Sequence, residues 1–504
     1  MPTLTRRAFG ASLVAGAVAA RPSLRAVAAQ RPATPTDLAW LTLTEAADLV
    51  AARKVSPTEL VTACLERIRI YNPKLNAFIT VTGEAALARA KALESATTRG
   101  PLHGVPIALK DNIDTAGVRT TAASSVFDDR VPDEDAEVTR RLTAAGAIVL
   151  GKLNLHEFAN GGTSATSYYG PVRNPWALDR NPGGSSGGSA AAVSAALCYG
   201  ALGTDTGGSI RTPASFCSIV GLKPTYGLVS IRGIIPLVVS LDHCGPMTRT
   251  VADAALMLNA LAGYDRLDIA SVEHQAEDYV KSMAQPVKGL RVGVARAPFF
   301  DHLDADVAAA TEAALKTIAG LTRGLTDVVL PTTRDVNLGG EMYAWHESLF
   351  TQMAGRYQIP TRRNLQSGNA TKAADYIRGR WALERLRRTI DDSFRDVDVV
   401  VLPTRRHTPR TVDAALQREE TDVPRNPELE NTGQFNAYGI PAVSVPCGFT
   451  AAGLPVGLMI AGPRFAEGRV LALARAFEQA TEWHTRRPPL TPDTPVPPLA
   501  RTTQ

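Results

Sequence analysis

Short apolar runs and longer segments with helical periodicity alternate along most of the chain. The sequence Ser56-Pro57-Thr58-Glu59 is a capping box with proline at the first helical position, and it predicts a helix that continues to about Tyr71. A second helix is predicted over residues 137–144. Apolar runs typical of buried strands occupy residues 105–109, 148–150, 290–294, 328–330, 397–402, 442–445 and 456–460. Because helical patterns separate several of these runs, we expect an α/β protein with a wide sheet covered by helices on both faces.

The first 28 residues differ from the rest of the chain and resemble an export signal. Arg6-Arg7 precedes an apolar run over residues 9–20, which is too short to span a bilayer. Pro22 ends the run, and Ala26-Val27-Ala28 offers an A-x-A cleavage site. The paired arginines predict a twin-arginine-type signal, so we expect export to the periplasm or beyond and no stable membrane insertion after cleavage. A general secretory signal and an uncleaved anchor remain the alternatives.

The remainder of the chain is expected to have three parts. Residues 29–40 are predicted to form a linker, and residues 41–487 one large domain, because no break in composition divides them. Residues 488–504 are a proline-rich tail that we expect to be extended and bound to the surface.

Charge and cysteine content exclude several classes of protein. The 504 residues carry a net charge of +5, but residues 1–28 contribute four arginines and no acidic residue, so the body is nearly neutral. Nothing therefore indicates nucleic-acid binding. The five cysteines are odd in number and form no C-x-x-C motif, which predicts neither a disulfide framework nor a zinc site. One cluster of arginines is predicted to be the solvated face of a helix, with a partner site as the alternative: Arg378, Arg380, Arg385, Arg387 and Arg388.

Two glycine-rich loops carry the strongest chemical signal. The first is Gly183-Gly184-Ser185-Ser186-Gly187-Gly188-Ser189, and the second is Gly207-Gly208-Ser209-Ile210-Arg211. A helix predicted over residues 190–197 joins them. Glycines beside a serine allow the backbone to approach a ligand closely and to present its N–H groups. The two loops are therefore able to converge on one site.

Lys110 is an unusual residue because it ends the apolar run at residues 105–109. A lysine in a low-dielectric environment has a lowered pKa, and its neutral amine can act as a general base. A serine hydroxyl needs such a base to become a nucleophile at neutral pH.

These segments together resemble the amidase signature family, and the resemblance covers nearly all of residues 40–489. The segments that carry it are residues 104–112, 183–189, 203–213, 221–227, 242–247, 439–442 and 453–457. The resemblance implies a large mixed twisted sheet with helices on both faces. It also implies a Ser-Ser-Lys triad in which Ser209 is the nucleophile, Ser185 the bridging serine and Lys110 the base.

Further roles are implied by the same resemblance. The bridging serine of the family follows a cis peptide bond. The backbone N–H groups that would form an oxyanion hole belong to Thr206, Gly207, Gly208 and Ser209. Residues expected to fix the two loops are Ser186, Asp205 and Arg211, and those expected to bind substrate in the segment 159–164 are Ala159, Gly161 and Gly162.

The implied function is an amidase that hydrolyses the C–N bond of a small carboxylic amide to an acid and an amine or ammonia, through an acyl-enzyme. No metal and no cofactor are expected, and a homodimer is a possible assembly. The amidase component of a tRNA-dependent amidotransferase and an ester or carbamate hydrolase of the same fold are the alternatives. A non-catalytic exported binding protein is a further alternative, and the intact Lys110, Ser185 and Ser209 argue against it.

Other catalytic constellations are weaker. Residues 183–187 also satisfy G-x-S-x-G, so an α/β-hydrolase elbow at Ser185 is an alternative, with His484 as its histidine. His156-Glu157 and His346-Glu347 begin H-E-x-x-H motifs but lack the second histidine, and they do not predict a metal site.

Overall fold

The computed structural model describes residues 34–96, 100–421 and 431–500, so the predicted export signal lies outside the described residues. These residues form an eleven-stranded sheet in the order β1-β3-β2-β4-β6-β5-β10-β11-β9-β7-β8. Its strands are β1 (Phe78–Val81), β2 (Pro106–Lys110), β3 (Ile148–Leu153), β4 (Gly200–Asp205), β5 (Val220–Lys223), β6 (His243–Thr248), β7 (Val292–Ala295), β8 (Leu325–Val328), β9 (Val399–Pro403), β10 (Ala442–Phe449) and β11 (Pro455–Ala461). Strand β2 is parallel to β3 and β4, β7 is parallel to β8 and β9, and the other pairs are antiparallel. The sheet is therefore mixed, as the resemblance implied.

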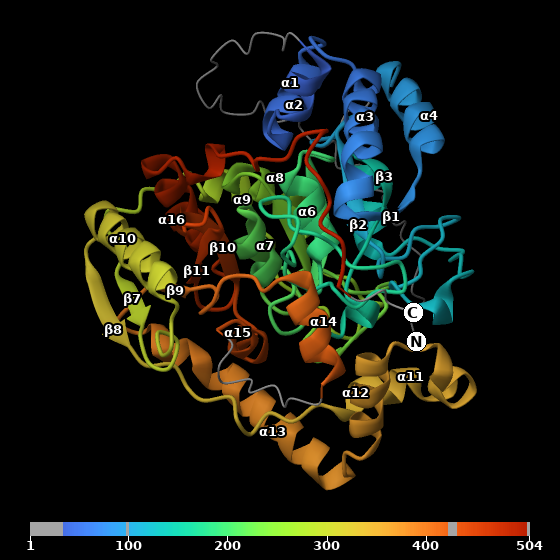
Figure 1. The fold of residues 1–504 in the computed structure, drawn as a ribbon. Helices are drawn as coiled ribbons and strands as arrows, with labels where there is room; N and C mark the ends of the chain where they lie inside the picture. The colour runs from blue at the N-terminus through green and yellow to red at the C-terminus, as the bar shows by residue number, and fades with distance from the viewer. Residues whose placement is uncertain (1–33, 97–99, 422–430, 501–504) are drawn as a thin grey trace, which may run out of the picture.

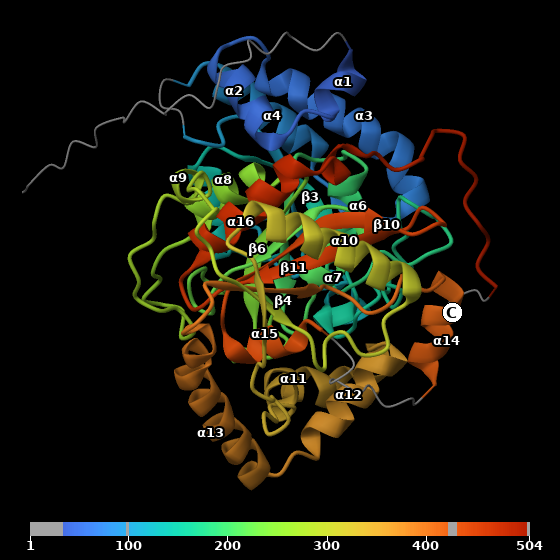
Figure 2. The same cartoon turned by 90° about the vertical axis from the view of Figure 1, so that its left-hand side faces the viewer.

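Helices cover both faces of this sheet (Figures 1 and 2). In β9, Val399 and Val401 belong to one hydrophobic core, whereas Val400 and Leu402 belong to another, because successive side chains of a strand point to opposite faces. The larger core includes residues of α8 (Val251–Leu261), α10 (Ala305–Leu321) and α16 (Glu467–Ala480). The second core includes residues of α13 (Ala373–Thr389) and α15 (Gly433–Tyr438).

The remaining α-helices complete the cover. They are α1 (Pro35–Ala39), α2 (Leu43–Ala51), α3 (Pro57–Leu75), α4 (Gly83–Glu94), α5 (Glu137–Ala144), α6 (Gly187–Ser194), α7 (Arg211–Cys217), α9 (Tyr279–Ser282), α11 (Gly340–Met353), α12 (Ile359–Asn369) and α14 (Val412–Glu420). Helices α1 to α4 lie at one end of the molecule, and α11 to α13 extend from the opposite end in both views (Figures 1 and 2). Among the described residues, no helix is long and apolar enough to cross a membrane.

Most elements predicted from the apolar pattern are confirmed. The capping box of α3 forms as predicted, with Ser56 accepting from Glu59 N–H and Glu59 accepting from Ser56 N–H, although the helix continues beyond Tyr71 to Leu75. Helix α5 has the predicted bounds, and six of the seven predicted strands coincide largely with β2, β3, β7, β9, β10 and β11. The strand predicted at residues 328–330 is wrong in position, because β8 ends at Val328 and pairs with β7 through Leu325–Val328.

The strands that flank the site were missed because they are rich in small residues. Strand β4 contains Gly200 and Gly203, which make it unlike a continuous apolar run. A Cβ at Gly200 would lie 2.7 Å from Met257 Sδ, and one at Gly203 would lie 2.9 Å from Ser186 Oγ. The missing side chains thus allow α8 to pack directly on β4 at Gly200 and the Ser186 loop at Gly203. Helix α6 is buried along its whole length and spans 187–194, three residues earlier than predicted.

The predictions for residues 29–40 and for the arginine cluster need correction, whereas the described part of the tail is extended along the surface as predicted. Residues 35–39 form helix α1, so the segment predicted as a linker is partly helical. The proline-rich tail is held to the body, since Lys74 Nζ donates to Thr494 O at 2.7 Å and Arg173 Nη2 to Pro497 O at 2.8 Å. In the arginine cluster, Arg387 is not part of a solvated face, because its guanidinium donates to Ser240 O at 2.6 Å and lies over the ring of Tyr226.

Candidate active site

Four secondary-structure ends meet where the predicted catalytic residues lie. Strands β2 and β4 are parallel neighbours, with Leu109 paired to Leu202, so their carboxyl ends share one edge of the sheet. Lys110 is the last residue of β2, and Asp205 is the last residue of β4. Helix α6 begins directly after Ser186, and α7 begins two residues after Ser209. The carboxyl edge of a parallel strand pair is a common position for ligand sites.

Lys110 is fully buried, and its amine makes two hydrogen bonds to hydroxyl groups. Nζ donates to Ser185 Oγ at 2.7 Å and to Thr204 Oγ1 at 2.7 Å. Burial lowers the pKa of Lys110 to about 7, although the negative charges of Asp205 and Asp242 act in the opposite direction. A large fraction of the amine is therefore neutral near pH 7 and able to accept a proton.

The two serine loops contact each other through their backbones. Ser186 N–H donates to Ser209 O at 3.2 Å, and the hydroxyl of Ser186 bonds the backbone of Thr204. The peptide bond between Gly184 and Ser185 is cis, as the resemblance implied. Ser185 is buried, whereas Ser209 keeps 8% of its surface exposed. Within the described part of the chain, the Ser209 hydroxyl has no hydrogen-bond partner, so it remains available to a substrate.

Asp205 organises the loop that carries Ser209. Its carboxylate accepts hydrogen bonds from Gly208 N–H at 2.7 Å and Ile210 N–H at 3.1 Å, and from Arg211 Nε and Nη2 at 3.0 and 2.9 Å. Burial by itself would raise the pKa of Asp205, but the charge and hydrogen bonds of Arg211 hold it well below its ordinary value. Asn436 of α15 completes the cluster by donating to Asp205 Oδ1 at 2.8 Å and accepting from Arg211 Nη2 at 2.7 Å. The predicted contacts of Ser186, Asp205 and Arg211 with the loops are thus present.

The hydrogen bond from Gly208 changes the expected oxyanion hole. Because Gly208 N–H is directed to Asp205, it is not available to a substrate oxygen in this arrangement. The N–H groups of Thr206, Gly207 and Ser209 have no protein partner among the described hydrogen bonds. The four predicted donors are therefore reduced to three.

A small cavity lies beside the triad, and its wall is largely apolar. It is lined by Asn112, Ala159, Thr204, Thr206, Ile231, Ile234, Ile235, Pro236, Leu237, Asp242 and His243. Ala159, one of the residues predicted to bind substrate, lies at this cavity. Gly161 has a packing role, because a Cβ there would lie 2.1 Å from the His156 ring, and Gly162 is exposed beside Gly184.

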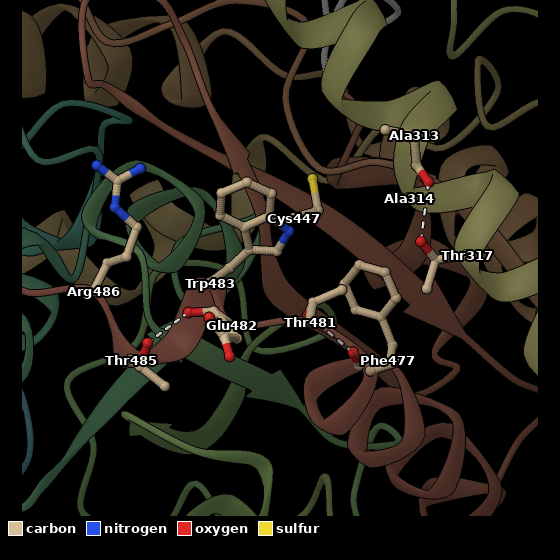
Figure 3. A pocket seen from close by; sticks show the side chains of 11 residues that line it. Ala313, Ala314, Thr317, Cys447, Phe477, Thr481, Glu482, Trp483, Thr485 and Arg486 are labelled. Carbon is tan, nitrogen blue, oxygen red and sulfur yellow. Dashed lines mark hydrogen bonds between the residues drawn. The ribbon is translucent and has the colours of Figure 1, made fainter.

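The competing constellations are not assembled. The Ser185 hydroxyl bonds Lys110, whereas His484 lines a different pocket with Trp40, Arg249 and Arg487, so the α/β-hydrolase reading is wrong. No group of three or more metal-binding side chains occurs among the described residues. A separate pocket of about 600 Å³ lies between α10, β10 and α16, and none of the predicted site residues lines it (Figure 3).

Comparisons with known proteins agree with this geometry. The sequence profile of the Amidase family matches residues 59–471. The chain belongs to the amidase family. Its curated relatives include the A-subunit of glutamyl-tRNA(Gln) amidotransferase from Moorella thermoacetica, which is 40% identical over 489 residues and is aligned over 90% of this chain and 99% of its own.

Solved structures of amidase-family enzymes have the same fold. The structure of 6-aminohexanoate cyclic dimer hydrolase superposes with a TM-score of 0.82 and 29% identity, covering 90% of this chain and 99% of that chain. The native peptide amidase from Stenotrophomonas maltophilia has a TM-score of 0.79 and 33% identity, covering 91% and 100%. This protein is accordingly an enzyme of the amide-hydrolysing class.

Several contributors to the site were not found from the sequence. Thr204 precedes Asp205 in β4 and accepts a hydrogen bond from Lys110, and Asn436 reaches the cluster from a segment more than 200 residues away. Asn112 follows Lys110 closely in the chain and donates to Ile235 O at 3.2 Å. Asn112 and Thr204 lie within the segments 104–112 and 203–213 that carry the resemblance, and this position was the usable signal for them.

Proposed function

We propose that this amidase hydrolyses its substrate through Ser209, Ser185 and Lys110. Ser209 Oγ attacks the amide carbonyl carbon, and its proton passes through the Ser185 hydroxyl to the neutral amine of Lys110. The N–H groups of Thr206, Gly207 and Ser209 stabilise the oxyanion. The C–N bond then breaks as the proton returns through Ser185 to the departing nitrogen, which leaves an acyl-enzyme that water hydrolyses.

The observation that carries this proposal is the buried hydrogen bond of 2.7 Å between Lys110 Nζ and Ser185 Oγ. A lysine whose pKa is lowered by burial to about 7 is matched to a proton transfer at neutral pH. Ile231, Ile234 and Leu237 line the small cavity next to the triad, and from their apolar side chains we propose a substrate with an apolar acyl group.

A fluorophosphonate probe followed by peptide mapping tests the assignment. We expect the label on Ser209 in the wild type, and neither label nor amide turnover in Ser209→Ala. Ser189→Ala is the matched control, because Ser189 lies in α6 directly after the Ser185 loop but donates to Leu202 O at 3.0 Å. Label on Ser185 that persists in Ser209→Ala would show that the nucleophile is assigned wrongly.

A second candidate function follows from the relatives. The 40% identity to the A-subunit of a glutamyl-tRNA(Gln) amidotransferase supports a role as the amidase component of a tRNA-dependent amidotransferase. We favour the independent hydrolase because Arg6-Arg7 and the apolar run after them support export through a twin-arginine route.

Cell fractionation and an amide panel separate the two functions. An independent exported enzyme is expected outside the cytoplasm and active when purified alone on amides with apolar or aromatic acyl groups. A cytoplasmic protein that co-purifies with other subunits and acts only on glutamine would support the second candidate. The same panel, extended to esters and carbamates, tests the preference for amides.

A further inference from the structure

Asp242 connects the loop of Ser209 to the wall of the cavity. It lies directly before β6, whose first residue, His243, pairs with Asp205 in β4. Asp242 Oδ1 accepts a hydrogen bond from Thr206 Oγ1 at 2.5 Å, and Oδ2 accepts one from Leu237 N–H at 2.9 Å. Val238 N–H also donates to Oδ1, at 3.2 Å. One carboxylate therefore holds two segments that face the same small space.

Both connected segments are part of the site. Thr206 is one of the three residues whose N–H groups remain available to an oxyanion, and its side chain is fixed by Asp242. Leu237 and Asp242 both line the cavity, as does Thr204, the residue that accepts a hydrogen bond from Lys110. The carboxylate also acts electrostatically on Lys110, since its negative charge favours the protonated amine.

We propose that Asp242 is a positioning residue for catalysis, which orients Thr206 and the segment 237–238 and whose negative charge stabilises Lys110 once it has accepted the serine proton. This inference rests on the proposed function of Lys110 and Ser209. Asp242 itself touches no reacting atom and acts through Thr206 and Lys110. It differs from Asp205, which is neutralised by its contact with Arg211.

Two groups at this site, Asp242 and Lys110, change charge near neutral pH. Burial raises the pKa of Asp242 to about 6, although its hydrogen bonds and Lys110 lower it, and burial lowers the pKa of Lys110 to about 7. The surrounding titratable groups are Asp205, Tyr226, His243 and Cys244. Arg211 holds the pKa of Asp205 low, and burial holds that of His243 well below its ordinary value. Burial raises the pKa values of Tyr226 and Cys244, the latter to about 12.

The sign of the expected effect follows from these charges. Above a pH of about 7 the working state has an ionised Asp242 and a neutral Lys110. Replacing Asp242 by asparagine removes the negative charge that favours protonated Lys110. The pKa of Lys110 should therefore fall, and activity should persist to lower pH than in the wild type.

The experiment measures the rate of fluorophosphonate labelling at Ser209 against pH, in the full chain, for the wild type and four variants. In Asp242→Asn the acid limb should move down by roughly 1 pH unit, the low end of the effect of a nearby charge. Its plateau rate should fall roughly tenfold or more, because the amide cannot accept from Thr206 and both backbone N–H groups at once. Asp242→Glu keeps the charge but not the geometry, so its plateau should fall while its acid limb stays in place.

Two further variants separate this role from a general loss of structure. Asp253→Asn is the matched control. Like Asp242, Asp253 is buried and accepts hydrogen bonds from a threonine hydroxyl and a backbone N–H, namely Thr44 Oγ1 at 2.8 Å and Thr44 N–H at 2.9 Å. Unlike Asp242, it is not among the charges that act on Lys110. Its profile should match that of the wild type. Thr206→Val should lower the plateau at least threefold, and this variant carries the positioning test if Asp242→Asn does not fold.

The outcomes decide between the two proposals. An Asp242→Asn profile that superimposes on those of the wild type and Asp253→Asn would overturn the inference about Asp242, as would an unchanged plateau in Thr206→Val. Failure of the wild type to be labelled at Ser209 would instead overturn the proposed function. A shifted acid limb in Asp242→Asn with a preserved limb in Asp242→Glu would support the inference.

Discussion

The buried amine of Lys110 gives the sharpest prediction for catalysis. A lysine with its ordinary pKa of 10.5 would be neutral in about one molecule in three thousand at pH 7. Burial lowers the pKa to about 7, so that about half of the molecules carry a neutral amine at that pH. The difference is roughly a thousandfold in the population of competent base, which corresponds to about 4 kcal/mol. Turnover should therefore fall about tenfold for each pH unit below 6 and reach a plateau above 8.

Substitutions of Lys110 test whether this amine is the base. Lys110→Met removes the base, and Lys110→Arg replaces it with a guanidinium that is not deprotonated in proteins. Both variants should lose at least a thousandfold in turnover at pH 8, while wild-type circular dichroism is retained. Lys152→Met is the matched control, because Lys152 is also fully buried but donates to Thr120 Oγ1 at 2.7 Å. Its acid limb should stay where it is in the wild type.

The assay is amide turnover between pH 5 and 10 with each purified protein. A Lys110→Arg enzyme within tenfold of the wild type would refute the reasoning, because a permanently charged side chain would then suffice. A wild-type rate that does not fall between pH 8 and pH 5 would refute it equally. A chelator should leave the wild-type rate unchanged, since the proposed nucleophile needs no metal.

Three further predictions concern stability and location. Between pH 7.5 and 10, Lys110 is protonated in the unfolded state and neutral in the folded state. The free energy of unfolding of the wild type should therefore rise with pH, relative to that of Lys110→Met, by about 1.4 kcal/mol per pH unit. Urea unfolding at several pH values measures this difference. In the same assay, Asp205→Asn should lower the free energy of unfolding by roughly 3–5 kcal/mol, because it leaves the charge of the buried Arg211 unpaired. Glu312→Gln, which breaks an exposed ion pair, should lower it by less than about 1 kcal/mol. Equal losses in the two variants would contradict this prediction. Changing Arg6-Arg7 to two lysines should retain the full-length protein in the cytoplasm, and processed protein outside the inner membrane would argue against a twin-arginine route.

Much of the architecture was determined locally and could be read from the sequence. Helix α3 begins at its capping box because the side chains of Ser56 and Glu59 satisfy N–H groups within one turn. Central strands such as β9 and β11 are continuous apolar runs because both of their faces are covered. The glycine and serine motifs likewise indicated the site, since their residue types restrict the backbone wherever they fold.

The tertiary structure decided how these local elements work together. Strand β4 was not recognisable from its own residues, because its glycines are explained only by the segments that pack against them. The pKa of Lys110 depends on burial, and the contact of Asn436 with Asp205 joins residues 231 positions apart. Likewise, only the fold shows that Gly208 N–H is used by Asp205 and that Asp242 holds Thr206. Residue type and spacing determine which groups are present, whereas desolvation and hydrogen-bond partners are set by distances that exist only after the chain has folded.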